Sequence, residues 1–496
     1  MTAAAPSSRD DTLAAERWLR RGLRLHRRQQ TEQAVAALER ALSYDPQLVD
    51  AMLWRGILAY QQAELAQAAH WFRQAIGHDP QLAAAHYNLG LTLEQLGQPT
   101  AALHCYDATI ALQPDHVQAH NNRAILLLEL GHAEQALASY DWALALRPEY
   151  LEARFNRGVA LASLRRWPEA IQAYETVLTL APAHHGARFA LAIAWLTVGD
   201  WARGWPQYEA RWDYPAVALA RLSRQAPEWV GPACAGQHLL VDAEQGFGDT
   251  LQFSRFILAL RAQGARVTLR AQPTLHRLLA NLPVEQVLAP SADVPGCDAQ
   301  ISLMSLPAPL GISTENIPAA EGWLQAPAAS VTDWQSWLAT HPGPRIGLVW
   351  AGNPQHHQDA QRSLDLALLL AALPPGLTYI PLQKQPDSRD VSLMMTTPHL
   401  RNLPRALTDF ADTAGLCQQL DLLISVDTSV AHLAGALGVP VWLLLAYHAD
   451  WRWLTDRDDT PWYQQTRLFR QQQAGHWLPV LQQVSAALHA RFGTQD

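Results

Sequence analysis

The sequence predicts a multidomain protein in which an all-helical repeat array precedes an α/β region with two parallel sheets. Two observations support this prediction. Prolines recur at one fixed interval through the first part of the chain, and beyond Tyr214 short apolar runs alternate with helix-like segments. The chain has 496 residues, 49% of them apolar, which suffices for several packed cores.

The composition narrows the classes of function. With 37 basic and 45 acidic side chains the formal charge is −8, which argues against a dedicated nucleic-acid binder. The segment from Met1 to Asp11 has no apolar core, and the longest apolar runs are too short to span a membrane. Four widely spaced cysteines predict neither a zinc knuckle nor a disulfide framework: Cys105, Cys234, Cys297 and Cys417. We therefore expect a soluble, cytoplasmic protein.

Four kinds of residue recur at a fixed interval in the N-terminal part of the chain and predict its architecture. This register consists of a proline, a small residue ten positions later, a second small residue after twelve more, and then a bulky residue. The prolines are Pro46, Pro80, Pro114, Pro148 and Pro182, and the bulky residues are Leu38, Phe72, Tyr106, Tyr140, Tyr174 and Tyr208. Small residues let two antiparallel helices approach closely, and proline ends the second helix. The pattern resembles the tetratricopeptide repeat, which has about 34 residues per copy, in six copies over residues 12–214.

An asparagine ladder accompanies the repeats. Asn88, Asn122 and Asn156 recur at the same interval as the prolines, and stacked carboxamides are able to hold an extended peptide backbone through a donor and an acceptor each. The superhelix of O-linked N-acetylglucosaminyltransferases holds protein substrates with a similar ladder. Local hydrogen bonding within each repeat is the alternative interpretation. The array itself predicts a concave surface for a protein or peptide partner.

Beyond the array we expect a connector over residues 215–236 and then two Rossmann-like domains, over residues 237–330 and 344–492. The first is predicted to contain strands at 238–243, 266–271 and 299–304, with a helix at 248–263 after its first strand. Residues 327–344 are interpreted as a second connector. The second domain is predicted to contain strands at 345–351, 377–382, 420–426 and 439–445. Facing sheets of this kind place a ligand cleft at the carboxyl ends of their strands.

The first strand-to-helix junction of chemical interest is Glu244-Gln-Gly-Phe-Gly-Asp249-Thr250. Gly246 and Gly248 allow close backbone approach, and the helix that follows offers free amides and a positive dipole end. An ordinary helix cap by Asp249 is the alternative.

The second junction runs from a buried strand into Asp427-Thr428-Ser429-Val430, followed by His432. Unpaired amides and two hydroxyl groups form a cradle for a diphosphate, and Asp427 is suited to bond sugar or ribose hydroxyls. Capping alone also explains the Asp-Thr-Ser run, and His432 is alternatively a packed core residue.

Together, several segments resemble bacterial tetratricopeptide proteins with a C-terminal glycosyltransferase domain similar to ADP-heptose:lipopolysaccharide heptosyltransferases. These segments are Glu244–Thr250, Gly347–Asn353, Pro381–Lys384, Asp409–Thr413, Ser425–Gly438 and Asp450–Trp453. The resemblance covers essentially the whole chain and implies the GT-B fold, two Rossmann-like domains that face one another. It also implies a metal-independent inverting transfer with no cofactor beyond the nucleotide-sugar donor.

The resemblance assigns roles by position. Asp249 matches the proposed catalytic base, in an acceptor loop with Gly246, Gly248 and Thr250, and Asp427-Thr428-Ser429 matches the Asp-Thr-Gly stretch that holds the donor diphosphate. In this chain serine replaces the glycine.

A cation must also neutralise the leaving group. Lys384, the only lysine of the chain, is the first choice and Arg362 the second. Trp350 and Asn353 are candidates for the base or ribose pocket, with core packing as the alternative for Trp350. Asp450–Trp453 and Trp462 either close over the donor or form an interface. His356 and His357 show no metal-ligand pattern.

The leading hypothesis is a glycosyltransferase whose repeats recruit a protein acceptor, such as a bacterial surface or flagellar protein. The alternatives are a catalytically inactive adaptor that uses the GT-B fold for docking, and a transferase for cell-envelope glycans. The leading hypothesis requires the loops at Gly248 and Thr428 to face one another across a single crevice that side chains do not fill.

Overall fold

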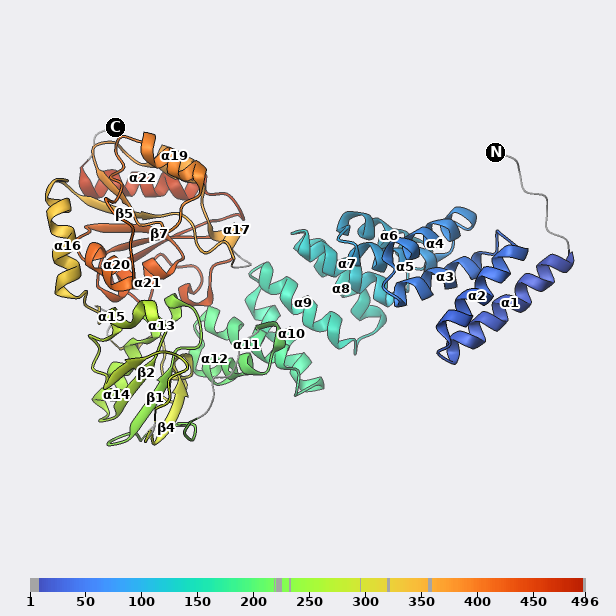
Figure 1. Ribbon diagram of the computed structural model, residues 1–496, viewed down its shortest axis with the longest axis horizontal. Helices are drawn as coiled ribbons and strands as arrows, with labels where there is room; N and C mark the ends of the chain where they lie inside the picture. The colour runs from blue at the N-terminus through green and yellow to red at the C-terminus, as the bar shows by residue number, and fades with distance from the viewer. Residues whose placement is uncertain are drawn as a thin grey trace. The chain divides into compact units, whose positions relative to one another are not determined.

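A computed structural model describes residues 9–217, 219, 225–231, 233–294, 296–318, 322–355 and 359–493. The chain divides into two compact units, Met1–Pro182 and Ala183–Asp496 (Figure 1). Within the described residues no helix combines the length and the apolar character that crossing a membrane requires.

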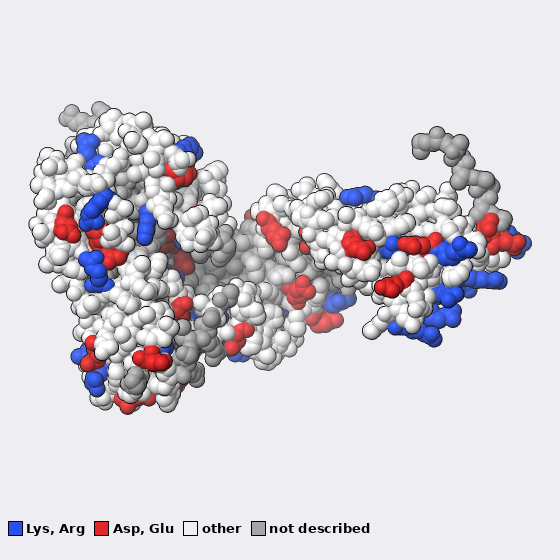
Figure 2. All heavy atoms as spheres, in the orientation of Figure 1, with Lys and Arg blue, Asp and Glu red and all other residues white. Residues whose placement is uncertain are grey.

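The first unit is all-helical and consists of five antiparallel helix pairs. They are α1 (Arg9–Arg27) with α2 (Thr31–Tyr44), α3 (Val49–Gln61) with α4 (Leu65–His78), α5 (Ala83–Gln95) with α6 (Pro99–Leu112), α7 (Val117–Glu129) with α8 (Ala133–Leu146), and α9 (Leu151–Ser163) with α10 (Trp167–Leu180). Each of the five periodic prolines lies two positions beyond the last residue of a second helix, as predicted. In the view of Figure 2, basic side chains gather over α1 and α2 at the N-terminal end of this unit.

The small and bulky residues of the repeat pack against each other. A Cβ atom added to Gly56, Gly90 or Gly158 would lie 2.5–2.6 Å from the ring of the bulky residue sixteen positions later. Such a separation is below van der Waals contact, so glycine is what allows the paired helices to approach this closely. The predicted role of the small positions, close approach of the two helices of a pair, is therefore confirmed at these three glycines.

The sixth predicted repeat is also a helix pair, formed by α11 (His185–Val198) and α12 (Trp201–Tyr208), and its residues belong to the second compact unit. Two short 3₁₀ turns follow, η1 (Glu209–Trp212) and η2 (Pro215–Val217). Leu196, Trp201 and Trp205 are buried in the same hydrophobic core as the first parallel sheet. The last helix pair thus packs as part of the α/β unit.

The first sheet is parallel, with strand order β3-β2-β1-β4. Its strands are β1 (His238–Asp242), β2 (Arg266–Arg270), β3 (Gln286–Leu288) and β4 (Ala299–Ser302). Three of them match predicted strands. The short β3 was not predicted, because a strand of this length carries too little periodic signal.

Helical segments surround this sheet: α13 (Phe247–Phe253), α14 (Arg255–Ala262), η3 (Pro273–Leu275), α15 (His276–Leu279) and η4 (Leu303–Ser305). The single helix predicted over 248–263 is divided at Ser254. The hydroxyl of Ser254 donates to the carbonyl of Leu251, and the indole N–H of Trp323 donates to the same hydroxyl. Serine side chains compete in this way with helical backbone bonds.

The second sheet is also parallel, with order β6-β5-β7-β8-β9. Its strands are β5 (Arg345–Val349), β6 (Thr378–Pro381), β7 (Leu422–Val426), β8 (Val441–Leu445) and β9 (Thr466–Arg470), the last of which was not predicted. The accompanying elements are α17 (Asp359–Arg362), α18 (Leu366–Ala372), α19 (Ser388–Thr396), α20 (Phe410–Cys417), α21 (Ser429–Ala436), η5 (Trp451–Trp453) and α22 (Leu478–Phe492).

The predicted connector at 327–344 is wrong for most of its length, because α16 (Ala328–Ala339) occupies it. Pro327 precedes the helix and proline residues reappear at 342 and 344, so the prolines mark the ends of a helix. Trp334 and Leu338 of α16 are buried, and the helix contacts α20.

Candidate functional site

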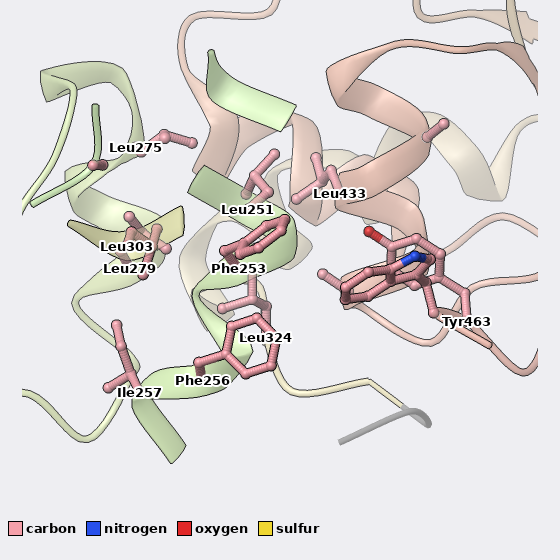
Figure 3. Packing of buried hydrophobic residues seen from close by; sticks show 14 of the residues in the cluster. Leu251, Phe253, Phe256, Ile257, Leu275, Leu279, Leu303, Leu324, Leu433 and Tyr463 are labelled. Atoms are coloured by element: carbon pink, nitrogen blue, oxygen red, sulfur yellow. The ribbon is translucent and has the colours of Figure 1, made fainter. Parts of the chain in front are cut away.

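The junction between the two sheets brings together the two strand-to-helix loops singled out in the sequence. A Cβ atom on Gly248, in the first turn of α13, would lie 2.9 Å from Cδ2 of His432 and 3.6 Å from Cα of Ser429. Leu251 of α13 and Leu433 of α21 lie side by side in the core below (Figure 3). The two loops therefore face one another, as the leading hypothesis requires, but at Gly248 the space between them is filled by the His432 ring.

Asp249 lies at this junction with its side chain 23% exposed. One carboxylate oxygen accepts a hydrogen bond from the amide of Gly246 at 2.9 Å, and the other forms an ion pair with the guanidinium of Arg452. Burial raises the pKa of this carboxyl, and the charge of Arg452 opposes the increase. The net direction is upward, which makes Asp249 a stronger base than an ordinary aspartate.

Arg452 links the two halves of the site, and the sequence argument did not single it out. Its guanidinium also donates to Oδ1 of Asp450 at 2.9 Å and to Oε1 of Gln252 at 2.7 Å, so one buried cation contacts two carboxylates. The nearest signal in the sequence is the segment Asp450–Trp453. That segment gives no indication of a partner at Asp249, which is 203 residues earlier.

The Asp427-Thr428-Ser429 run lies at the carboxyl end of β7 and at the first turn of α21. Thr428 is the N-cap residue, and its hydroxyl lies 3.1 Å from the hydroxyl of Ser425. Among the described residues, no protein group accepts a hydrogen bond from the amides of Ser429 and Val430. Free amides at a helix start are suited to an anion such as phosphate.

Asp427 is held in place by an aromatic residue. Its Oδ2 accepts a hydrogen bond of 2.8 Å from the indole of Trp453, and 19% of its side chain is exposed. Burial raises the pKa of Asp427, the charge of Asp450 adds to the increase, and Arg452 and Arg362 oppose it.

His432 is packed in the core, which agrees with its alternative interpretation as a core residue. The ring stacks on Trp453, and Nδ1 lies 2.8 Å from the hydroxyl of Tyr463. Burial lowers the pKa of His432 to about 3, and the nearby Arg452 and Arg255 act in the same direction. The imidazole is therefore neutral at physiological pH.

The remaining tryptophans of the junction also serve as packing. Trp451, Trp453 and Trp462 are 5%, 1% and 0% exposed, which corresponds to the interface interpretation. They belong to the hydrophobic core that residues of both sheets share.

The loop after β1 is tightly bonded internally. Thr250 is buried, and its hydroxyl donates to Gln272 at 3.1 Å and to the carbonyl of Gly246 at 3.2 Å. Of the predicted acceptor loop, Gly246 is exposed, whereas Thr250 holds the loop in place. Glu244 of the same loop is buried beside Arg211, and burial raises its pKa to about 7. The sequence argument treated Glu244 only as part of the motif.

The donor candidates of the second sheet fall into two groups. Trp350 is 1% exposed within the second core cluster, and its indole donates to Asp390 at 2.7 Å. Core packing therefore describes Trp350, and its ring is not available to stack on a base. Asn353 is exposed, and its side chain caps the turn by accepting from the amide of Gln355.

Arg362 lies close to the Asp427 cradle, and Lys384 is one strand further along the sheet. The Arg362 guanidinium covers the backbone of Gly352, directly after β5, and its charge lowers the pKa of Asp427. Strand β5 pairs with β7, whereas Lys384 follows β6 at the edge. Lys384 is exposed, and no described residue forms an ion pair or hydrogen bond with it.

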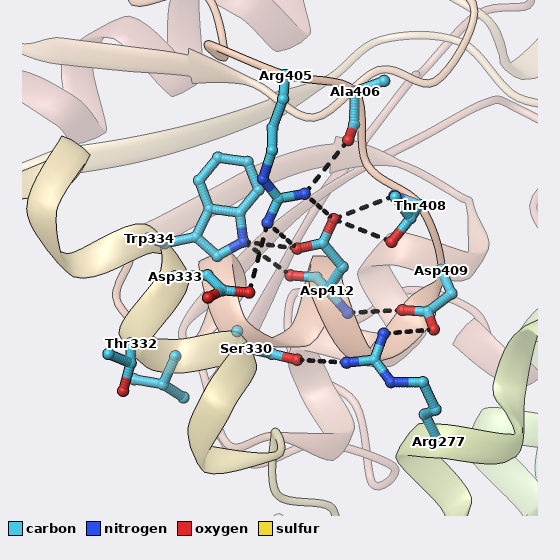
Figure 4. A network of polar contacts seen from close by, with 12 residues as sticks. Arg277, Ser330, Thr332, Asp333, Trp334, Arg405, Ala406, Thr408, Asp409 and Asp412 are labelled. Atoms are coloured by element: carbon cyan, nitrogen blue, oxygen red, sulfur yellow. Dashed lines mark hydrogen bonds and ion pairs between the residues drawn. The ribbon is translucent and has the colours of Figure 1, made fainter.

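The Asp409–Thr413 segment has a packing role. Asp412 receives two hydrogen bonds of 2.7 Å from Arg405 and one of 3.0 Å from the indole of Trp334 (Figure 4). Burial alone would raise the pKa of Asp412, but the bonds and charge of Arg405, together with the bonds from the Thr408 amide and the Trp334 indole, outweigh it and the net pKa is lowered. Asp409 caps α20 and pairs with Arg277 of α15, so the segment ties α16, α20 and α15 together.

The asparagine ladder of the repeats is partly engaged within the protein. The amide of Asn88 donates to the carbonyl of Ala84 in its own helix at 2.7 Å. Asn122 donates to the hydroxyl of Tyr87 in the neighbouring repeat at 3.3 Å. Asn156 is half-buried.

A cavity of about 440 Å³ opens elsewhere in the second unit, lined by residues of η1, the segment at 226–228, β1 and β4. Neither Asp249 nor Asp427 lines it. Among the described residues, no three His, Cys, Asp or Glu side chains are grouped to hold a metal ion, and His356 and His357 lie outside the described residues.

Comparison with known families identifies the first part of the chain. Tetratricopeptide repeat models match residues 19–83, 83–116, 105–138, 122–185 and 163–219. The N-terminal region is therefore a tetratricopeptide array, a module for protein interaction.

Among curated proteins, the chain is similar to Protein FlbA of Caulobacter vibrioides, with 27% identity over 311 residues, 58% of this chain and 52% of FlbA. The match thus spans about half the length of that relative. Among solved structures, YrrB, described as a tetratricopeptide protein with an unusual peptide-binding site, is 22% identical with a TM-score of 0.33, covering 35% of this chain and 89% of YrrB. PilF of Pseudomonas aeruginosa is 20% identical with a TM-score of 0.37, covering 42% of this chain and 95% of PilF.

Proposed function

We propose that the protein is an inverting glycosyltransferase of GT-B type that transfers a sugar from a nucleotide-sugar donor to a protein recruited by its repeats. One observation carries the proposal. The helix starts of α13 and α21, which follow strands of two different parallel sheets, meet at Gly248 and Ser429. This contact brings the loop of Asp249 next to the Asp427-Thr428-Ser429 cradle, and the proposal assigns both to one site.

In the proposed reaction, an acceptor hydroxyl oxygen attacks the anomeric carbon of the donor sugar. Asp249 takes the hydroxyl proton as the new bond forms. The bond from the anomeric carbon to the diphosphate oxygen breaks, and the diphosphate leaves with the electron pair. The free amides of Ser429 and Val430 and the hydroxyl groups of Thr428 and Ser429 are placed to stabilise the developing negative charge.

Two cations are assigned separate roles. Arg362 is the candidate for the leaving diphosphate, since it follows β5, which pairs with the β7 strand of Asp427, whereas Lys384 follows the edge strand β6; Arg362 is also paired with Asp359 at 3.1 Å. Arg452 holds Asp249 and Asp450 in place across the junction and must yield Asp249 to the acceptor hydroxyl during the reaction. Lys384 remains a second candidate, reached if the loop after β6 moves toward the donor.

Calorimetric titration of the intact protein with ADP, GDP, UDP and CDP tests the donor half of the proposal. We expect at least one of the four to bind, and Arg362→Ala to weaken its binding at least tenfold. Arg389→Ala is a matched control, because Arg389 is 68% exposed and pairs with Asp365. Failure of all four nucleotides to bind would instead favour an adaptor in which the α/β unit serves only for docking.

The catalytic half is tested separately with Asp249→Asn, which keeps the shape of the side chain. We expect this variant to retain nucleotide binding and to lose transfer at least a hundredfold. Mass spectrometry of proteins from cells with and without the gene would give the mass of the transferred sugar and the identity of the acceptor. Transfer at the wild-type rate in Asp249→Asn would contradict the assignment of the base.

A further inference from the structure

One continuous surface of the repeat unit is formed by the first helices of successive pairs, and we call it the inner face. Helix α3 contacts α5, and α7 contacts α9. Hydrogen bonds cross it from helix to helix: Gln95 donates to Tyr60 at 2.6 Å and Asn122 donates to Tyr87 at 3.3 Å. The side chains of the inner face are therefore rich in tyrosine hydroxyls and carboxamides, which suit a peptide backbone.

The inner face carries three carboxylates without a counter-ion. Glu94, Glu129 and Glu152 stand at the ends of α5, α7 and α9, and within the described part of the chain none of them forms an ion pair. Glu129 raises the pKa of Glu94, so these two carboxylates lie within electrostatic range of one another. Burial raises the pKa of Tyr140, and Glu152 and Glu129 add to the increase, so both carboxylates act on the same tyrosine. Glu94 is half-buried, and burial is the largest cause of its raised pKa.

The arginines of the same helices are committed elsewhere. Arg55 pairs with Glu39 and the side-chain oxygen of Gln67, and Arg123 pairs with Asp107. Arg157 pairs with Asp141 in the same way, one repeat further along the chain. These partners lie on second helices, and Arg154 of α9 donates to the carbonyl of Pro148, so within the described part of the chain none of the four arginines forms an ion pair with Glu94, Glu129 or Glu152. On the face shown in Figure 2, basic side chains are densest over α1 and α2, with fewer along the rest of the array.

From this arrangement we propose that the inner face of α3, α5, α7 and α9 binds an extended basic peptide. Its Lys or Arg side chains pair with Glu94, Glu129 and Glu152, and its backbone bonds the Asn, Gln and Tyr side chains between them. Charge complementarity selects the partner, since an acidic peptide would add like charges to an unpaired acidic surface. The identification of this peptide as part of the sugar acceptor rests on the proposed function, whereas its binding to the inner face does not.

Fluorescence anisotropy with the intact protein and no sugar donor tests the proposal. The probes are labelled peptides of alternating Arg and Ser, Glu and Ser, or Gln and Ser. We expect the Arg peptide to bind at least tenfold more tightly than the other two, and to weaken with added salt as exposed ion pairs do. Because no donor is present, a failure of sugar transfer leaves this result untouched.

The variant Glu94→Gln/Glu129→Gln should weaken the Arg peptide at least tenfold. Glutamine still accepts the hydrogen bond that Tyr106 donates to Glu94, and the melting temperature verifies that the fold is retained. The matched control is Glu134→Gln/Glu175→Gln, which removes the same charge from exposed residues of the second helices α8 and α10 and should leave binding unchanged. Equal weakening by both double variants, or equal binding of the Glu peptide, would overturn the proposal.

Discussion

The contact between α13 and α21 is open to a direct test, the addition of one methyl group in Gly248→Ala. The new Cβ would lie 2.9 Å from Cδ2 of His432, and that ring is fixed by its bond to Tyr463 and its stacking on Trp453. Overpacking of this kind costs about 1–3 kcal/mol. Replacing a helical glycine by alanine returns about 0.5–1 kcal/mol. The two ranges combine to a net loss of about 0–2.5 kcal/mol in the free energy of unfolding, and because the His432 ring is fixed we expect about 1–2 kcal/mol of it.

Scanning calorimetry of the intact protein measures this loss, because it resolves the transitions of separate units. At about 2–4 °C per kcal/mol, the transition of the second unit should fall by about 2–8 °C. Gly246→Ala is the matched control in the same loop, since its new Cβ would meet only the Asp249 carboxylate, at 3.2 Å. An unchanged transition in Gly248→Ala would refute the packing of the two helix starts against one another.

Three further predictions concern other parts of the molecule. Gly90→Ala would place a Cβ 2.6 Å from the Tyr106 ring and should destabilise the repeat unit by about 1–3 kcal/mol, measured by urea unfolding; wild-type stability would contradict the register. Burial and the charge of Asp450 raise the pKa of Asp427 in the folded protein. The stability that this carboxyl contributes is therefore present at pH values below its pKa in the unfolded chain, and it is lost as the pH rises through its pKa in the folded protein. The difference in melting temperature, Asp427→Asn minus wild type, should hence increase from pH 5 to pH 8, and a constant difference would refute this. Burial raises the pKa of the Cys417 thiol to about 12, so iodoacetamide at pH 8 should leave it unmodified until denaturant is added, as mass spectrometry would show.

Much of the fold followed from the sequence because its signals are local. The proline register, the glycines at 56, 90 and 158, and most strands were predictable from spacing and apolar runs alone. The exceptions have separate causes. Strand β3 is short, α16 lies between prolines that also suit a connector, and Ser254 divides a helix through a contact with Trp323, 69 residues away.

The candidate site was only partly predictable. The sequence identified Asp249 and Asp427–Val430, since strand-to-helix junctions with glycine or hydroxyl residues have a local signature. It could not distinguish a ligand pocket from a packed core for Trp350 and His432, because burial depends on distant neighbours.

By itself, then, the sequence determined the repeats, the two parallel sheets and the two loops that could carry chemistry, all of which depend on residues close together in the chain. Only the tertiary structure decided which side chains are enclosed, that Arg452 joins Asp249 to Asp450, and that the arginines of the repeats leave three carboxylates unpaired. The physical reason is that charge pairing and burial are set by atoms brought together from far apart in the sequence, and no local period records them.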